Sequence, residues 1–175
     1  MTTRFEECLP FILAREGGKV DDPADRGGRT AYGITQRTYD SWRGGSADEM
    51  DVWDITQQQV ANIYKSLYWT LAHCDDLPAG LDLVVFDAAV NHGVARSVKF
   101  LQRALAVTED GVFGMDTKNA MESDQTAGAL PELIDTCISV RRSFYHALVV
   151  RQPSQEKFSR GWENRLQALS AAVHA

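Results

Sequence analysis

The sequence predicts a mainly α fold with at most a short β element near residues 18–34. After residue 35, hydrophobic side chains recur at helical spacing, and sustained strand-like alternation is absent. The chain has 175 residues, of which 44% are hydrophobic and 24% charged, which is enough for a real core. Residues 15–35 differ from the rest because glycines and carboxylates crowd there. That segment is either a solvated loop or a site.

The first predicted helix runs from about residue 4 to residue 16. Thr3 and Glu6 have the T-x-x-E form of a capping box at its start. Gly17 and Gly18 can end it in a left-handed conformation. These signals frame a helix whose last turn opens directly into the glycine-rich segment.

Glu16 falls on the apolar face of this helix, because it continues the stripe of Phe5, Leu9 and Ile12. Loss of hydration and the negative end of the helix dipole both favour a protonated carboxyl there. A general acid needs such an environment. The alternative is a simple ion pair of Glu16 with Arg15 or Arg29.

Five further helices are expected before the longest periodic stretch of the chain. The first spans residues 36–42, with Thr35 as its cap and Gly44–Gly45 at its end, and the second begins at a T-x-x-Q box and reaches about residue 73. The third follows a turn at 77–80, the fourth covers 95–105, and the fifth is short and begins near Asp116 or Thr117. Tyr64, Tyr68 and Trp69 on the second helix are either core or the wall of a sugar groove.

The longest periodic stretch begins at Pro131, after a loop expected at 123–128, and the final helix carries Phe158, Trp162, Leu166 and Leu169. Asp87 and Asn91 share one face of the helix that follows the 77–80 turn. They form either a structural hydrogen bond or a substrate contact. Neither possibility is favoured by spacing alone.

Residues 16–35 have the form E-G-G-x-V-x-D-P-x-D-x-G-G-x-T-x-Y-G-I-T. This run resembles the signature of the glycoside hydrolase family 108 N-acetylmuramidases, which occur in phage endolysins and in secretion-associated muramidases. Its order of glutamate, aspartate and threonine is similar, more distantly, to phage-type lysozymes. Lys19 departs from the pattern, since an aromatic residue is expected there.

Later motifs resemble the carboxy-terminal peptidoglycan-binding module of the same family. They are F-D-x-A-V-N-x-G at 86–93, D-G-V-F-G-x-x-T at 110–117, R-R-x-F-Y-x-x-L at 141–148 and F-x-x-G-W-x-x-R at 158–165. The resemblance implies a lysozyme-like helical fold, with a catalytic module at 1–77 and a binding module at 78–175 packed as one globular unit.

The resemblance also implies a peptidoglycan hydrolase that cleaves the β-1,4 bond between N-acetylmuramic acid and N-acetylglucosamine. Such cleavage needs a proton donor and a second carboxylate or a water. Glu16 is the expected donor, Asp25 the second carboxylate, and Thr30 the holder of a water or sugar hydroxyl. The expected substrate-binding residues are Asp22, Tyr32, Asp87, Asn91, Tyr145 and Trp162.

Other function classes fit the sequence less well. A net charge of −6 argues against a nucleic-acid binder. The four histidines form no H-x-x-x-H or H-x-H pair, so no metal or other cofactor is expected. His73 and Cys74 are adjacent in sequence, which disfavours a cysteine amidase, and the three cysteines are expected to be buried apolar residues.

The alternative to an enzyme is a non-catalytic wall-binding or phage structural protein on the same fold. The amino terminus carries acidic residues where an export signal would be basic. We therefore expect a monomer made in the cytoplasm, which reaches peptidoglycan of the periplasm or cell wall through a separate device such as a holin or a secretion system.

Overall fold

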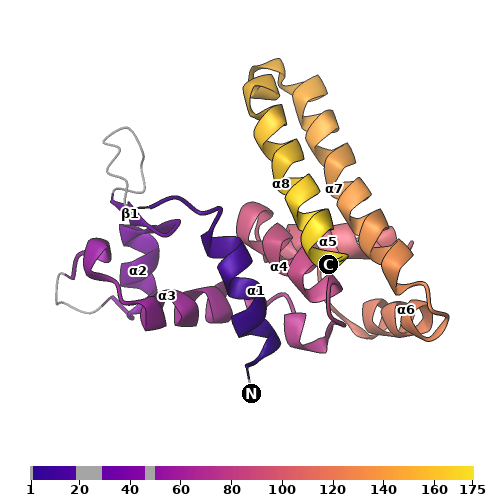
Figure 1. The fold of residues 1–175 in the computed structure, drawn as a ribbon, viewed down its shortest axis with the longest axis horizontal. Coiled ribbons are helices and arrows are strands. Elements are labelled where there is room, and N and C mark those ends of the chain that lie inside the picture. The colour runs from indigo at the N-terminus through magenta and orange to yellow at the C-terminus, as the bar shows by residue number, and fades with distance from the viewer. Residues whose placement is uncertain (1, 19–28, 46–49) are drawn as a thin grey trace. The chain divides into compact units, whose positions relative to one another are not determined.

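The computed structural model describes residues 2–18, 29–45 and 50–175 (Figure 1). It is mainly α, as predicted, and the described residues contain one small sheet of two strands. The chain forms two compact units, residues 1–70 and 71–175. No helix within the described ranges is both long and apolar enough to cross a membrane.

The first unit opens with α1, Arg4–Leu13. The predicted capping box is confirmed, because the Thr3 hydroxyl accepts from the Glu6 amide and the Glu6 carboxylate accepts from the Thr3 amide. The helix ends earlier than predicted, at Leu13 rather than near residue 16. The amides of Arg15 and Glu16 both donate to the Ile12 carbonyl, which tightens the chain into a final turn.

The predicted β element lies at Thr30–Ala31 (β1) and Ile34–Thr35 (β2), which pair antiparallel. Helix α2, Gln36–Trp42, follows directly, and the Thr35 side chain caps it as predicted. A short 3-10 turn, η1, spans Val52–Asp54. The Gln36 side chain accepts from the Val52 amide and so ties η1 to α2.

The second predicted helix is α3, Gln57–Tyr64, with a capping box of Thr56 and Gln59. It does not continue as an α-helix to residue 73. A π-helical turn, η2, Lys65–Trp69, follows instead, with the Thr70 amide bonded to the Lys65 carbonyl at 2.8 Å. The extra residue in this turn directs the Trp69 ring into the core, edge-on to Phe5.

The second unit begins with a 3-10 turn, η3, Cys74–Asp76, and the helix α4, Leu81–His92. Residues 81–89 of α4 are all buried, so this helix forms the centre of the unit. Helix α5, Val94–Ala104, packs against it and against α7. An apolar helix buried on every side can tolerate a charge only where that charge is paired.

The segment between α5 and α6 is organised by Gln102, which is buried. Its side-chain nitrogen donates to Asp110, to the Val112 carbonyl and to Thr117, and its oxygen accepts from the Gly111 amide. These bonds give the D-G-V-F-G-x-x-T motif a structural role. Helix α6, Met115–Thr126, then runs further than predicted and includes part of the expected loop.

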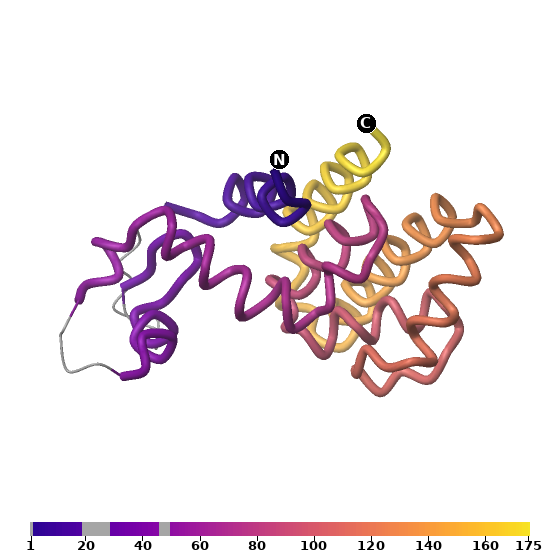
Figure 2. The backbone as a smooth tube through the Cα atoms, turned by 90° about the horizontal axis from the view of Figure 1, so that it is seen from below, coloured from indigo at the N-terminus to yellow at the C-terminus, as the bar shows by residue number. Residues whose placement is uncertain are grey.

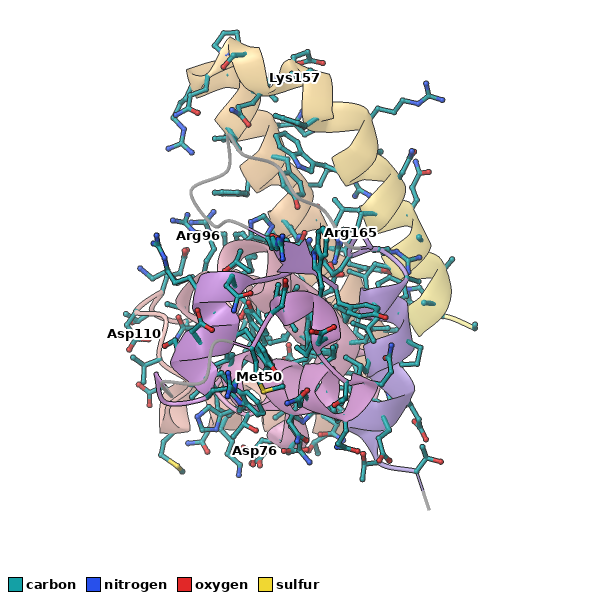
Figure 3. The ribbon with its side chains drawn as sticks, turned by 90° about the vertical axis from the view of Figure 1, so that its left-hand side faces the viewer. Met50, Asp76, Arg96, Asp110, Lys157 and Arg165 are labelled. Atoms are coloured by element: carbon teal, nitrogen blue, oxygen red, sulfur yellow. The ribbon has the colours of Figure 1, made fainter. Side chains whose placement is uncertain are left out.

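A long hairpin completes the unit. Helix α7, Leu130–Arg151, and helix α8, Ser159–Val173, lie side by side and are joined by the 3-10 turn η4, Pro153–Phe158 (Figure 1). Figure 2 shows the same two helices, in orange and yellow, from below. Pro131 is in the first turn of α7, as predicted. Figure 3 shows Lys157 at the far end of the hairpin and Arg165 further along α8.

Candidate functional site

Glu16 lies just beyond the end of α1, where its side chain is half-buried. Its amide donates to the Ile12 carbonyl at 3.1 Å, which fixes the backbone of Glu16 to the end of the helix. Phe5, Leu9 and Ile12 are buried on the face from which the side chain continues, as the sequence predicted. The carboxylate therefore starts from a rigid element and stays partly accessible.

A tight turn of the β1–β2 hairpin faces this carboxylate. Tyr32 and Gly33 occupy the two turn positions between the paired residues Ala31 and Ile34, with φ angles of 52° and 72°. Two consecutive positive φ values are typical of a type I′ turn, which matches the twist of a two-residue hairpin. Tyr32 is strained by this conformation, whereas glycine adopts it without cost.

Gly33 approaches Glu16 more closely than any other residue type could. A Cβ atom at position 33 would lie 2.9 Å from the Glu16 Oε2 atom and 3.0 Å from the Tyr64 hydroxyl. Both distances are shorter than ordinary non-bonded contacts. Glycine is thus required twice, for its φ angle and for the space that the carboxylate fills.

Helix α3 holds the turn in place through two side chains. The buried Tyr64 hydroxyl donates to the Tyr32 carbonyl at 2.7 Å, and the Gln57 side-chain nitrogen donates to the Tyr32 hydroxyl at 3.0 Å. Because Tyr64 also reaches the space beside Gly33, it links the turn, the helix and Glu16. The predicted substrate-binding residue Tyr32 accordingly has a fixed backbone and a bonded ring hydroxyl.

The aromatic residues Tyr64, Tyr68 and Trp69 were expected either in the core or in the wall of a sugar groove, and they differ in burial. Trp69 is fully buried, whereas Tyr68 is half-buried with its ring centre 5.6 Å from that of Tyr64. Burial, together with the charge of nearby Glu16, raises the pKa of the Tyr68 hydroxyl. Tyr68 therefore keeps its proton and presents a neutral hydroxyl near the carboxylate.

Of the other expected catalytic residues, the structure describes Thr30. Thr30 is in β1, opposite Thr35, two residues before the turn that contacts Glu16. Asp22 and Asp25 lie outside the described residues. Glu16, Thr30 and Tyr32 therefore belong to one local arrangement in the first unit, built from the end of α1 and the hairpin.

The expected substrate-binding residues of the second unit gather around Asp87. One carboxylate oxygen accepts from the Arg141 guanidinium at 2.5 Å, and the other accepts from Arg165 at 2.9 Å. Asp87 has 0% of its surface exposed, and the Asn91 side chain donates to its backbone carbonyl. This geometry favours the structural alternative for the Asp87–Asn91 pair.

The electrostatics of this cluster follow from burial and from the two arginines. Burial alone would raise the pKa of the Asp87 carboxyl, but Arg141 and Arg165 outweigh it and lower that pKa. Burial and the neighbouring Arg141 also lower the pKa of His92 to about 3. His92 is therefore neutral at pH 7, and its Nε2 atom accepts from Arg141 at 3.1 Å.

Tyr145 and Trp162 extend the cluster toward the α7–α8 hairpin. Their rings stack nearly parallel, with centres 4.5 Å apart. The Tyr145 hydroxyl lies 3.0 Å from His92 and accepts from Arg141 at 3.3 Å. Tyr145 is buried, whereas Trp162 is half-buried, so Trp162 is the more accessible of these two expected substrate-binding residues.

Comparison with known families gives two matches on the chain. The family described as Glycosyl hydrolase 108 matches residues 9–93. A second, described as a predicted peptidoglycan domain, matches residues 96–167. The solved structure of Brucella abortus SagA is 32% identical, with a TM-score of 0.79, and the alignment covers 97% of this chain and 92% of that one. A comparison with curated proteins gave no match.

The chain belongs to the glycosyl hydrolase 108 family. It is thus a glycoside hydrolase that acts on peptidoglycan, and it carries a peptidoglycan-binding domain. The family match extends to residue 93, through α4, whereas the expected catalytic module ended at 77 and the first compact unit ends at 70. Sequence families and compact units therefore divide this chain at different places.

Rival hydrolase classes would rely on the cysteines or on a bound metal ion. Cys8, Cys74 and Cys137 are buried free thiols, as expected, and burial raises the pKa of Cys137 to about 12. Cys74 is buried while the neighbouring His73 side chain lies on the surface beside Asp76. Within the described ranges, no group of three His, Cys, Asp or Glu residues could hold a metal ion.

Sequence reasoning did not identify several residues that shape these sites. Gly33 is a member of the 16–35 motif and Tyr64 an aromatic residue of the second expected helix, but their positions beside Glu16 depend on folding. Arg141 offered a clearer signal, since it interrupts an apolar stripe of α7. A charge at a buried position needs a partner, and Asp87 in the apolar α4 was the matching one.

Proposed function

We propose that this family member is a lysozyme-type N-acetylmuramidase that cleaves the β-1,4 bond between N-acetylmuramic acid and N-acetylglucosamine, with Glu16 as general acid. The observation that supports it is the position of Glu16. The carboxylate is half-buried, anchored at the end of α1, and packed against a turn that only glycine can form at position 33. Such support keeps a proton donor in one orientation.

In the proposed reaction, Glu16 protonates the oxygen of the leaving sugar as the glycosidic bond breaks. The oxocarbenium-like centre then needs a carboxylate or an activated water on its other side. We assign the carboxylate to Asp25 and the holding of a water or sugar hydroxyl to Thr30, which the β1–β2 pairing fixes near the turn. Tyr68, kept neutral, can donate a hydrogen bond beside Glu16.

The test is digestion of purified peptidoglycan, with mass spectrometry of the products. The parent protein should leave muramic acid at the reducing end. Glu16→Gln keeps the side-chain shape but supplies no proton, so the rate should fall by about 100-fold or more with unchanged circular dichroism. Glu7→Gln, which changes an exposed glutamate of α1, is the matched control and should stay fully active.

Activity of Glu16→Gln within a few fold of the parent would end the assignment of this residue. In the same assay, Asp25→Asn should lose far more activity than stability, whereas Asp22→Asn should lose mainly stability because Pro23 makes Asp22 a turn-former. A folded, inactive Asp22→Asn beside an active Asp25→Asn would exchange their roles. A protein that adheres to sacculi without releasing fragments would instead be a non-catalytic wall binder.

A further inference from the structure

A pocket of about 430 Å³ lies between α7 and α8, close to the turn η4 that joins them. Its apolar lining is formed by Val149 and Val150 of α7 and by Trp162 and Leu166 of α8. Val150 is 80% exposed, and Phe158 beside Trp162 is 47% exposed. Exposed apolar side chains that gather at one pocket mark a surface that a ligand or partner covers.

The rim of this pocket carries charges of both signs. The Arg142 guanidinium donates to both oxygens of Glu163, at 3.0 and 3.3 Å, and Glu156 and His146 also line the pocket. The hydrogen bond from Arg142 holds the pKa of the Glu163 carboxyl below its ordinary value. At neutral pH the rim thus offers the Arg142 guanidinium and the ionised Glu163 carboxylate to the same ligand.

The lining does not suit a sugar ring. Sugars stack on a free aromatic face and need several hydroxyl or amide partners. One face of Trp162 is already covered by Tyr145, whose hydroxyl is bonded to Arg141. Among the described residues that line the pocket, hydroxyls come only from Tyr145 and Ser159, and no side-chain amide is present.

We propose that this pocket binds the peptide stem of peptidoglycan. A stem combines small alkyl side chains with carboxylates and an amine, which matches an apolar wall bordered by Arg142 and by the carboxylates of Glu156 and Glu163. The inference rests on the proposed function, since it assigns to the same substrate a second point of attachment outside the glycan. The pocket then selects glycan strands that carry stems.

The direct test is calorimetric titration of the full-length protein with three probes: a disaccharide–tetrapeptide, the free tetrapeptide and the peptide-free disaccharide. Both peptide probes should bind, and the bare disaccharide should bind at least about tenfold more weakly. Val150→Glu places a charge in the apolar wall and should weaken peptide binding by about tenfold or more. Because Val150 is exposed, the variant should fold normally.

Ala147→Glu is the matched control. It introduces the same side chain on an exposed position of α7 that does not line the pocket, and peptide binding should be unchanged. Equal affinity for the bare disaccharide, no binding of the free tetrapeptide, or parental binding by Val150→Glu would each overturn the proposal. So would a dimer that Val150→Glu dissociates, because the pocket would then belong to a second copy.

A second experiment separates failure of this inference from failure of the proposed function. Glycan strands are compared with and without their stems, after removal of the stems by an amidase. Val150→Glu should cleave intact peptidoglycan more slowly than the parent and cleave the stripped strands at the parental rate. If Val150→Glu and the parent cleave both substrates at equal rates, the peptide site alone is overturned. If neither substrate yields products that end in muramic acid, the muramidase assignment is overturned, and the inference with it.

Discussion

At the scale of single residues, the space beside Gly33 can hold either a Cβ atom or the Glu16 carboxylate, but not both. The 2.9 Å separation from Oε2 leaves no room for a methyl group without displacement. Tyr64, at 3.0 Å from the same point, is fixed by its bond to the Tyr32 carbonyl and cannot move away cheaply. The flexible carboxylate is therefore the group that would shift.

We predict that Gly33→Ala abolishes most of the activity because it displaces the Glu16 carboxylate. The left-handed backbone at position 33 adds a stability cost of about 1–2 kcal/mol. Gly44→Ala is a matched control, since Gly44 has a φ of 81° with nothing within 4 Å of the added Cβ. Thermal unfolding and peptidoglycan digestion measure the two effects. Equal activities of the two variants would show that the carboxylate does not depend on this contact.

The sequence was sufficient to single out Glu16 but not its surroundings. Glu16 follows an apolar stripe and begins the E-G-G run, and both features are local in the sequence. Tyr64, which holds the turn beside Glu16, lies 31 residues beyond Gly33 in the chain, and its position depends on where α3 packs. No local pattern reports such a contact, so Tyr64 was expected only as core or groove wall.

At the scale of helices, Asp87 connects α4 to both α7 and α8. Its two ion pairs are buried, with Asp87 and Arg141 side chains 0% and 1% exposed. Removing one member of such a cluster leaves uncompensated charge in the core. The outward pair of Arg142 and Glu163 joins α7 to α8 as well, but its side chains are 37% and 41% exposed.

We predict that Asp87→Asn lowers the free energy of unfolding by about 3–5 kcal/mol, because two arginines lose their counter-charge inside the unit. Glu163→Gln, which breaks the exposed pair, should lower it by about 0–1 kcal/mol. Chemical denaturation followed by circular dichroism measures both. A stable Asp87→Asn protein that had lost affinity for peptidoglycan would instead support the expected substrate contact.

The same cluster predicts a pH dependence of stability. His92 takes up a proton near pH 6.5 when unfolded but only near pH 3 when folded, so unfolding binds an extra proton between these values. Stability therefore falls as pH decreases through that window, by at most about 1.4 kcal/mol per pH unit. The lowered pKa of Asp87 acts in the same direction, because the stabilisation by its ionised carboxylate is lost as the pH falls through the pKa of Asp87 in the folded protein.

His92→Gln tests this dependence, since an amide oxygen can accept from Arg141 but does not titrate. Unfolding free energies of parent and variant, measured between pH 7 and pH 4, should converge or cross as the pH falls. The slopes of the two proteins should differ by about one proton. Parallel slopes would mean that His92 does not carry the effect.

Helices were predicted well wherever caps and apolar spacing agreed. The capping boxes at Thr3 and Thr56, the Thr35 cap and the Pro131 start are all observed. Errors arose at helix ends. The polar residues of 123–126 resemble a loop in composition, yet they continue α6 because no glycine or proline interrupts the helix before Gly128.

At the scale of the whole molecule, the family match and the compact units overlap without coinciding. The match to residues 9–93 includes α4, which belongs to the second compact unit. The residues that bury α4 come from α5, α7 and α8. The last helix of the hydrolase match is therefore buried by helices of the peptidoglycan-binding domain.

We predict that a fragment of residues 1–77 is inactive and lacks a cooperative unfolding transition. It ends before α4 and so omits sixteen of the residues, 78–93, that the hydrolase family match includes. Solubility, thermal unfolding and digestion of peptidoglycan decide the matter. A soluble 1–77 fragment that unfolds cooperatively and cleaves peptidoglycan would establish two independent domains.

The π-helical turn at Lys65–Trp69 limits how this protein can be recombined with its relatives. One residue corresponds to about 100° of rotation around a helix. A crossover that removed a residue between Tyr64 and Thr70 would restore a regular helix, but it would rotate Trp69 out of the core of the first unit. Chimeras should therefore exchange this turn whole, with its residue count unchanged.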